Sequence, residues 1–193
     1  DGTYRSADPS VRFDRVTRTS TAEFVVTRAD QSTYTFTSGA LSALRDRRGR
    51  MLTVARSGGN LVQITEPVSG ARLAFTNSSA GVTRVADQSG RAFTFAYDAA
   101  GYLVAITDPA GRATRYAYAG GRMVRVTAPD GVVTYSNTYD AAGRVIQQDD
   151  GRSDNRVMSF AYDETSQAGR VVTTVTKRDG ATRTYTHNTQ LQL

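Results

Sequence analysis

The glycines of this chain recur at a fixed interval, and that regularity constrains the fold more than any other feature. One series has spacings of 20 or 21 residues and consists of Gly49, Gly70, Gly90, Gly111, Gly131 and Gly151. A second series lies between its members, with spacings of 20 or 22 residues: Gly39, Gly59, Gly81, Gly101, Gly121 and Gly143. A fixed period is typical of repeat proteins, in which one supersecondary unit is stacked many times. Two glycine series of one period indicate two turns, and therefore two strands, in each unit.

The clearest copy of the unit spans residues 93–112. Aromatic residues alternate with smaller ones over residues 93–97, which predicts a strand with its aromatic side chains on one face. Residues 98–101 predict a turn, because Asp hydrogen-bonds its own backbone and Gly supplies a positive φ. Residues 103–107 then form the second strand, and residues 108–111 form a second turn that begins with Asp-Pro and ends on Gly.

The repeats predict an all-β fold. About seven units of ~20 residues fill residues 33–193, and a sheet with more than ~10 strands must curl or close. We therefore expect a curled antiparallel sheet that is a segment of a spiral, shell or barrel. Residues 1–32 fit the frame less well and are expected to be opening strands that cap the array. Residues 40–48 contain good helix formers, but their register predicts a strand followed by a turn.

A β-propeller is the alternative architecture, because two units have the size of a four-stranded blade. The units are uniform along the chain, without alternating inner and outer strands, and this favours one continuous sheet.

Composition limits the chemistry of the chain. It has no cysteine and one histidine, which excludes disulfides, thiolate metal sites and a histidine-rich metal site. No apolar run approaches 18 residues, so we expect no membrane span. The net charge is +6, with most of the excess in residues 1–96. A basic half would suit nucleic acid or an anionic surface. Solvated sheet faces explain the same charge, and we expect no nucleic-acid partner.

Three segments resemble the YD repeat of RHS proteins. They are the YDAAGYL of residues 97–103, the YDAAGRV of residues 139–145, and the Tyr-Asp and Gly-Arg-Val elements of residues 162–171. The resemblance covers about residues 33–185, and it weakens where Tyr-Asp is replaced, for example at residues 118–119.

The resemblance implies a long β-strand spiral that forms a hollow shell. In bacterial RHS toxins and insecticidal toxin complexes such a shell encloses a C-terminal toxin, and teneurins use a similar barrel in adhesion. We therefore expect a non-enzymatic structural segment that encapsulates a C-terminal toxin or effector, in a protein that is secreted or lies on the bacterial cell surface. A surface adhesion module that binds carbohydrate or a partner protein is the alternative.

The resemblance also bears on the ends of the segment. We expect it to be a piece of a longer chain, with the cargo and any cleavage residues beyond Leu193. Residues 108–112 lack the leucine of the self-cleavage motif DPxGL of many RHS proteins, and we interpret them as an ordinary repeat turn. Unpaired strand edges of such a piece favour self-association.

No catalytic, cofactor-binding or metal site is predicted, and no cofactor. His187 is interpreted as a stacked structural residue. The acids of residues 149–155 have the wrong spacing for a calcium loop. The arginines around Asp46 would suit phosphate. The Arg-Tyr mixture of residues 115–125 would suit single-stranded nucleic acid, but an arginine and a tyrosine that are neighbours in a strand lie on opposite faces and do not stack together. Residues 77–79 match a glycosylation sequon, which by itself carries little weight.

The repeated tyrosines allow two interpretations. Exposed rings would form a series of sugar-stacking platforms, whereas buried rings would form a cross-strand packing stripe. Recurrence in nearly every unit favours packing, because a binding site is usually local. The residues concerned are Tyr97, Tyr116, Tyr118, Tyr139 and Tyr162.

Overall fold

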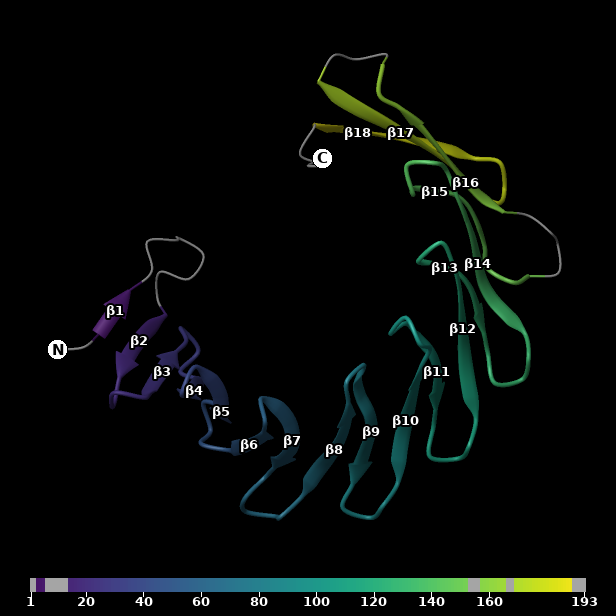
Figure 1. The fold of residues 1–193 in the computed structure, drawn as a ribbon. Helices are drawn as coiled ribbons and strands as arrows, with labels where there is room; N and C mark the ends of the chain where they lie inside the picture. Colours follow the sequence, from purple (N-terminus) through teal and green to yellow (C-terminus); the bar gives the residue numbers. More distant parts are fainter. Residues whose placement is uncertain (1–2, 6–13, 153–156, 166–168, 189–193) are drawn as a thin grey trace. The chain divides into compact units, whose positions relative to one another are not determined.

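The computed structural model of the chain describes residues 3–5, 14–152, 157–165 and 169–188, and these residues form a sheet without any helix (Figure 1). In chain order the strands are β1 (Thr3–Arg5), β2 (Arg15–Arg18), β3 (Glu23–Thr27), β4 (Thr33–Thr37), β5 (Ala40–Arg45), β6 (Met51–Ser57), β7 (Asn60–Thr65), β8 (Arg72–Ser78), β9 (Gly81–Asp87), β10 (Ala92–Tyr97), β11 (Leu103–Thr107), β12 (Ala113–Ala119), β13 (Arg122–Thr127), β14 (Val133–Tyr139), β15 (Val145–Asp149), β16 (Met158–Asp163), β17 (Arg170–Thr176) and β18 (Thr182–Asn188). The all-β prediction is confirmed.

Each strand pairs antiparallel with the next strand along the chain. The pairing continues through successive repeats, for example β6 with β7 and β7 with β8, so the sheet is not cut into the separate blades of a propeller. Residues 40–48 form strand β5 and the following turn, as their register predicts. Val11 and Phe13, two of the residues expected in the opening strands, lie outside the described residues.

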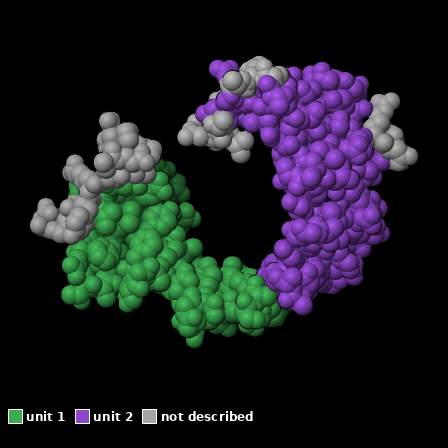
Figure 2. Space-filling view, turned by 45° about the horizontal axis from the view of Figure 1, so that its top comes forward, with its two compact units in different colours: residues 1–94 green, residues 95–193 purple. Residues whose placement is uncertain are grey.

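The chain divides into two compact units, Asp1–Thr94 and Phe95–Leu193 (Figure 2). Figure 1 shows that the sheet curves within each unit. The predicted division between residues 32 and 33 stays a prediction. Within the described residues, no helix has the length and apolarity that crossing a bilayer requires.

The two glycine series occupy opposite edges of the sheet, because successive hairpins of an antiparallel sheet turn at alternate edges. We name these the Gly39 edge and the Gly49 edge after the first member of each series. Gly111 shows why the residue is needed: it lies at φ +81° and its N–H donates to the carbonyl oxygen of Asp108 at 2.9 Å. This is a three-residue hairpin loop, in which a left-handed residue follows a type I turn.

The period alone places Gly58 outside both glycine series and predicts that Gly58→Ala is mild, and the structure corrects this prediction. Gly58 and Gly59 have φ values of +55° and +82°, and Ser57 and Asn60 on either side of them are paired. A two-residue hairpin loop of type I′ requires positive φ at both central positions. Substitution of Gly58 is therefore strained rather than mild.

The two faces of the sheet differ in polarity. Residues directly opposite each other across two antiparallel strands point to the same face, so the pairs define each face. The apolar face of the first unit carries Tyr34 opposite Leu44, Leu44 opposite Leu52, Val54 opposite Ile64, Ile64 opposite Leu73, Phe75 opposite Val85, and Val85 opposite Phe93. The polar face carries Thr35 opposite Ala43, Thr53 opposite Thr65, and Thr76 opposite Arg84. In the second unit, Tyr116 opposite Val126 continues the apolar pattern, and Ala117 opposite Arg125 the polar one.

The apolar face lacks the second layer that normally covers a sheet. Among the described residues, Ala86 is the one buried hydrophobic residue, with 4% of its surface exposed, and no large side chain is fully buried. Leu52, Leu73 and Phe93 are 41%, 41% and 46% exposed. The described part of the chain is a single layer rather than a domain with its own core.

Candidate functional site

The acidic residues of the turns are bound by their own hairpin loops. The carboxylate of Asp108 accepts hydrogen bonds from the backbone N–H groups of Ala110 and Arg112 at 2.9 and 3.0 Å. Its other oxygen accepts the Nε–H of Arg112 at 2.8 Å and lies 2.7 Å from Nη2. The pKa of Asp108 is therefore lowered, chiefly by the backbone hydrogen bond of Arg112 and next by its guanidinium. The same arrangement of Asp and Arg recurs in the turns of Asp46 and Asp87.

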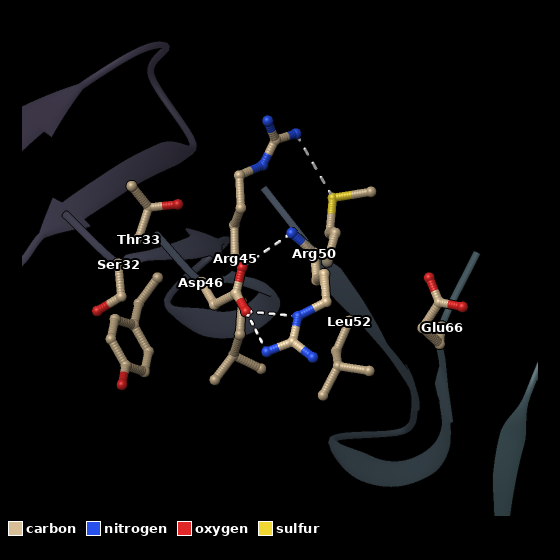
Figure 3. A pocket seen from close by; sticks show the side chains of 10 residues that line it. Ser32, Thr33, Arg45, Asp46, Arg50, Leu52 and Glu66 are labelled. Atoms are coloured by element: carbon tan, nitrogen blue, oxygen red, sulfur yellow. Dashed lines mark hydrogen bonds and ion pairs between the residues drawn. The ribbon is translucent and has the colours of Figure 1, made fainter. Parts of the chain in front are cut away.

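The arginine cluster around Asp46 lies beside a shallow hollow on the apolar face (Figure 3). The hollow has a volume of about 380 Å³, and Leu44 and Leu52 contribute to its lining. Arg50 binds Asp46 at 2.6 Å, and Arg45 lies with Nη2 3.9 Å from the sulfur of Met51. The charge of Arg50 is therefore already compensated by Asp46, and this weakens the hypothesis that the cluster binds phosphate.

A second hollow of about 410 Å³ shares Leu52 and Glu66 with the first. The two hollows are therefore one stretch of the uncovered apolar face, bordered by the Asp-Arg turns of the Gly49 edge. The structure offers here an apolar surface rather than a closed pocket with convergent polar groups.

The recurring tyrosines connect neighbouring hairpins through their hydroxyl groups. The hydroxyls of Tyr118, Tyr139 and Tyr162 donate to the carbonyl oxygens of Leu103, Met123 and Val145, at 3.0, 2.6 and 2.8 Å respectively. Each bond reaches back to the strand that begins after the preceding turn of the Gly39 edge. We call these contacts, with the side chains that cover the rings, the tyrosine ladder.

Asn77 occupies the corresponding place in an earlier repeat. Its Nδ2 donates to the carbonyl oxygen of Leu61 at 2.8 Å, so an amide replaces the phenol hydroxyl. The side chain of the sequon asparagine is therefore engaged in a hydrogen bond within the sheet.

In three repeats, the residue that follows the turn glycine of the Gly39 edge covers the tyrosine of the next repeat. The rings of Tyr102 and Tyr118 stack with centroids 4.9 Å apart and planes at 23°. The guanidinium of Arg122 lies 5.9 Å from the ring centroid of Tyr139. Arg144 lies 4.5 Å from the ring centroid of Tyr162 and pairs with Asp140 and Glu164. The expectation that arginine and tyrosine do not stack concerns neighbours along one strand, whereas these contacts join residues of different repeats.

His187 and the acidic residues of the 149–155 segment are the remaining candidates that the sequence raises. His187 lies on β18 opposite Val171, and its Nδ1 is buried without a hydrogen-bond partner in the described structure. Asp149 and Asp150 both pair with Arg178, and residues 153–156 of the predicted acidic loop lie outside the described residues. No group of three or more potential metal ligands occurs among the residues that the structure describes.

The sequence also matches a known family over part of its length. Residues 78–113 and 103–134 match the family model of the RHS repeat. Residues 78–134 carry RHS repeats. The resemblance inferred from the YD segments is confirmed, and the matched region includes the turn of Asp108 and the ladder bond of Tyr118.

Comparison with solved structures finds Tc toxin components, and these likenesses concern the fold alone. A Tc holotoxin pore of Photorhabdus luminescens with a TccC3 mutation has 10% sequence identity and a TM-score of 0.41, over 98% of this chain and 14% of that chain. The TcdB2-TccC3 structure has 9% identity and a TM-score of 0.43, over 97% of this chain and 15% of that chain. This chain therefore spans about one seventh of the length of each matched chain. No curated protein matches the sequence.

Proposed function

We propose that this chain is a non-enzymatic segment of the wall of an RHS-type β-shell. The shell encloses a C-terminal toxin or effector of the same protein, which is secreted or lies on the bacterial cell surface. The observation that carries this proposal is the uncovered apolar face of a single-layer sheet. The match to the RHS repeat supports it.

The exposed apolar side chains recur in register along the wall. Leu52, Leu73 and Phe93 lie on alternate strands of the first unit, each three residues after a turn glycine. Burial of apolar surface contributes about 25 cal/mol per Å², and large exposed apolar patches mark interaction sites. A polypeptide held against this face would supply the missing cover.

The polar chemistry of the described residues favours a structural role. Carboxylates such as Asp108 are engaged by the backbone of their own turns. The hydroxyls of Tyr118, Tyr139 and Tyr162 are engaged by backbone carbonyl groups. The residue types that recur in each repeat therefore support the sheet.

The proposal is tested in the longest natural chain that contains this segment. Leu73→Asp and Phe93→Asp place charges on the apolar face, and Ala74→Asp and Thr94→Asp place the same charges on the opposite face of the same strands. We expect limited proteolysis to release or degrade the downstream region faster in the first pair than in the second, with circular dichroism confirming that all variants keep the sheet. Equal protease sensitivity of the downstream region in the wild type and in all four variants would refute encapsulation by this face.

The alternative function, an adhesion module that binds carbohydrate, has one observation in its favour. Tyr135 is 50% exposed, which leaves part of its ring open to a sugar. Glycan-array binding that disappears in a stably folded Tyr135→Ala variant would establish this alternative. Self-association through strand edges is tested separately by light scattering across dilution.

A further inference from the structure

The hairpin β12–β13 places two arginines on the polar face without acidic partners. Arg115 and Arg125 are exposed, and neither side chain takes part in an ion pair or a hydrogen bond within the described residues. Arg115 lies opposite Thr127, and Arg125 lies opposite Ala117. The two arginines are therefore diagonal neighbours across adjacent strands, a relation that separates Cα atoms by about 7–8 Å.

The fold does not require arginine at either position. On β9, Arg84 also lies on the polar face, opposite Thr76. Arg115 and Arg125 each follow a turn glycine by four residues, and in three other repeats the corresponding residue of each is small or neutral. Those residues are Thr53, Ala74 and Thr94 for Arg115, and Ala43, Gln63 and Ala105 for Arg125. Two like charges in diagonal contact repel each other, so the pair opposes rather than assists the packing of the hairpin.

A hollow lies between the two arginines. It has a volume of about 490 Å³, and its lining includes Ala105, Ala117 and Thr127 beside the two arginines. The two alanines leave space next to the guanidinium groups, whose planar forks bind carboxylates and other oxyanions in bidentate fashion. The lining is mainly apolar apart from the arginines and a threonine, which suits an anionic group on an aliphatic stem.

We propose that this hollow, the β12–β13 arginine site, binds the acidic side chains of an extended segment of a partner protein, with a Glu-x-Glu pattern as its recognition element. In an extended peptide, alternate residues lie on one side about 6.6–6.8 Å apart, which matches the diagonal spacing of the two arginines. The site goes beyond the proposed function, because Arg115 and Arg125 lie on the face opposite to the apolar surface assigned to the cargo.

A nucleic-acid strand fits this site less well. Binding of single strands combines a long cationic track with aromatic rings that stack on successive bases. Tyr116 is the one aromatic residue among those that line the hollow, and the alternation of the strand directs its side chain to the apolar face, opposite Val126.

The test is an NMR titration of this chain with the peptide acetyl-Ala-Glu-Ala-Glu-Ala-amide. We expect saturable shifts at β12 and β13 that weaken with added salt. Arg115→Thr and Arg125→Ala, which install residues from equivalent positions, should each weaken binding about tenfold without lowering the melting temperature. Arg72→Thr, at an exposed arginine of the polar face on β8, serves as the matched control and should leave binding unchanged.

Three results would overturn the proposal. The first is the absence of saturable shifts at β12 and β13. The second is equal binding of the peptide with Gln in place of Glu. The third is tighter binding of a single-stranded oligonucleotide that also depends on Arg115 and Arg125, which would assign the site to nucleic acid instead.

Discussion

The substitution Tyr139→Phe tests whether the tyrosine ladder stabilises the sheet. It deletes the hydroxyl that donates to the carbonyl oxygen of Met123 at 2.6 Å, and it keeps the ring beneath the guanidinium of Arg122. The hydrogen bond joins the end of β14 to Met123 near the start of β13. Its loss therefore weakens the link between one hairpin and the next without changing the packed volume.

The expected magnitude follows from one lost hydrogen bond. A typical intramolecular hydrogen bond contributes about 0.5–1.5 kcal/mol net, and the half-buried carbonyl of Met123 would lose its side-chain donor. For a chain of this size, 1 kcal/mol corresponds to a shift of about 2–4 °C in the melting temperature. Tyr139→Ala also removes a half-buried ring, so we expect a larger loss, below the about 3–5 kcal/mol typical of fully buried aromatic residues.

Native-state hydrogen exchange is the appropriate assay, because repeat arrays open locally and a global melt averages over the array. Tyr139→Phe should accelerate exchange in β13 and β14. Tyr135→Phe is the matched control, since Tyr135 lies on the same strand and is 50% exposed, and its effect should stay within about 0.5 kcal/mol. If the two variants had equal exchange rates in β13 and β14, the hydroxyl bond would contribute nothing and the ladder would not couple the repeats.

Three further predictions concern the turns. Gly151→Ala should lower the stability in urea unfolding much more than Gly131→Ala. Both glycines have positive φ, but of the two only Gly151 would place a Cβ on a backbone oxygen, that of Val133. Equal effects of the two substitutions would contradict the described loop. Gly58→Ala should cost about 1 kcal/mol in a thermal melt, since a left-handed conformation disfavours a side chain, and a neutral result would refute the type I′ turn. Because its pKa is lowered in the fold, Asp108 stabilises the folded state at pH values above its unfolded pKa of about 3.9, and this stabilisation is lost as the pH falls through the lower folded pKa. Asp108→Asn should therefore reduce the dependence of the urea midpoint on pH below about 4. An unchanged dependence would contradict the lowered pKa of Asp108.

The features that the sequence predicts well are those fixed by local chemistry. In a segment such as Asp108–Gly111, the carboxylate accepts hydrogen bonds from backbone groups two and four residues further along the chain. Such turns form from their own residues, and the period of the turns sets the strands between them. This is why the array, the two strands per unit and the β5 strand follow from the sequence alone. The Gly58 prediction failed because a type I′ turn also needs a positive φ at the residue before the periodic glycine, a requirement that the period does not reveal.

The tyrosine ladder depends on register between strands and was therefore not predicted from sequence. The hydroxyl of Tyr139 reaches a carbonyl group 16 residues earlier, and the ring of Tyr139 is covered by Arg122, 17 residues earlier. A β-bulge at Thr138–Tyr139 also shifts the pairing of β14 with β15. A signal was nevertheless present: a long side chain directly follows the turn glycine at Tyr102, Arg122 and Arg144. Asn77 has no such signal, because nothing local distinguishes it from a surface asparagine.

The ladder and the turns together explain how a sheet without a core can hold its shape while leaving one face free. A globular domain is stabilised mainly by side chains packed between two layers. Here two recurring contacts join each hairpin to its neighbour: a hydroxyl to a carbonyl, and a ring under a side chain of the preceding repeat. A third recurring contact, a carboxylate to its own turn, stabilises each hairpin by itself. Nearest-neighbour stabilisation of this kind is what a repeat array needs. It leaves the apolar side chains of the first unit available for the contact with cargo that we propose. It also leaves the polar face exposed, so that this face can carry a feature absent from most repeats, such as the Arg115–Arg125 pair.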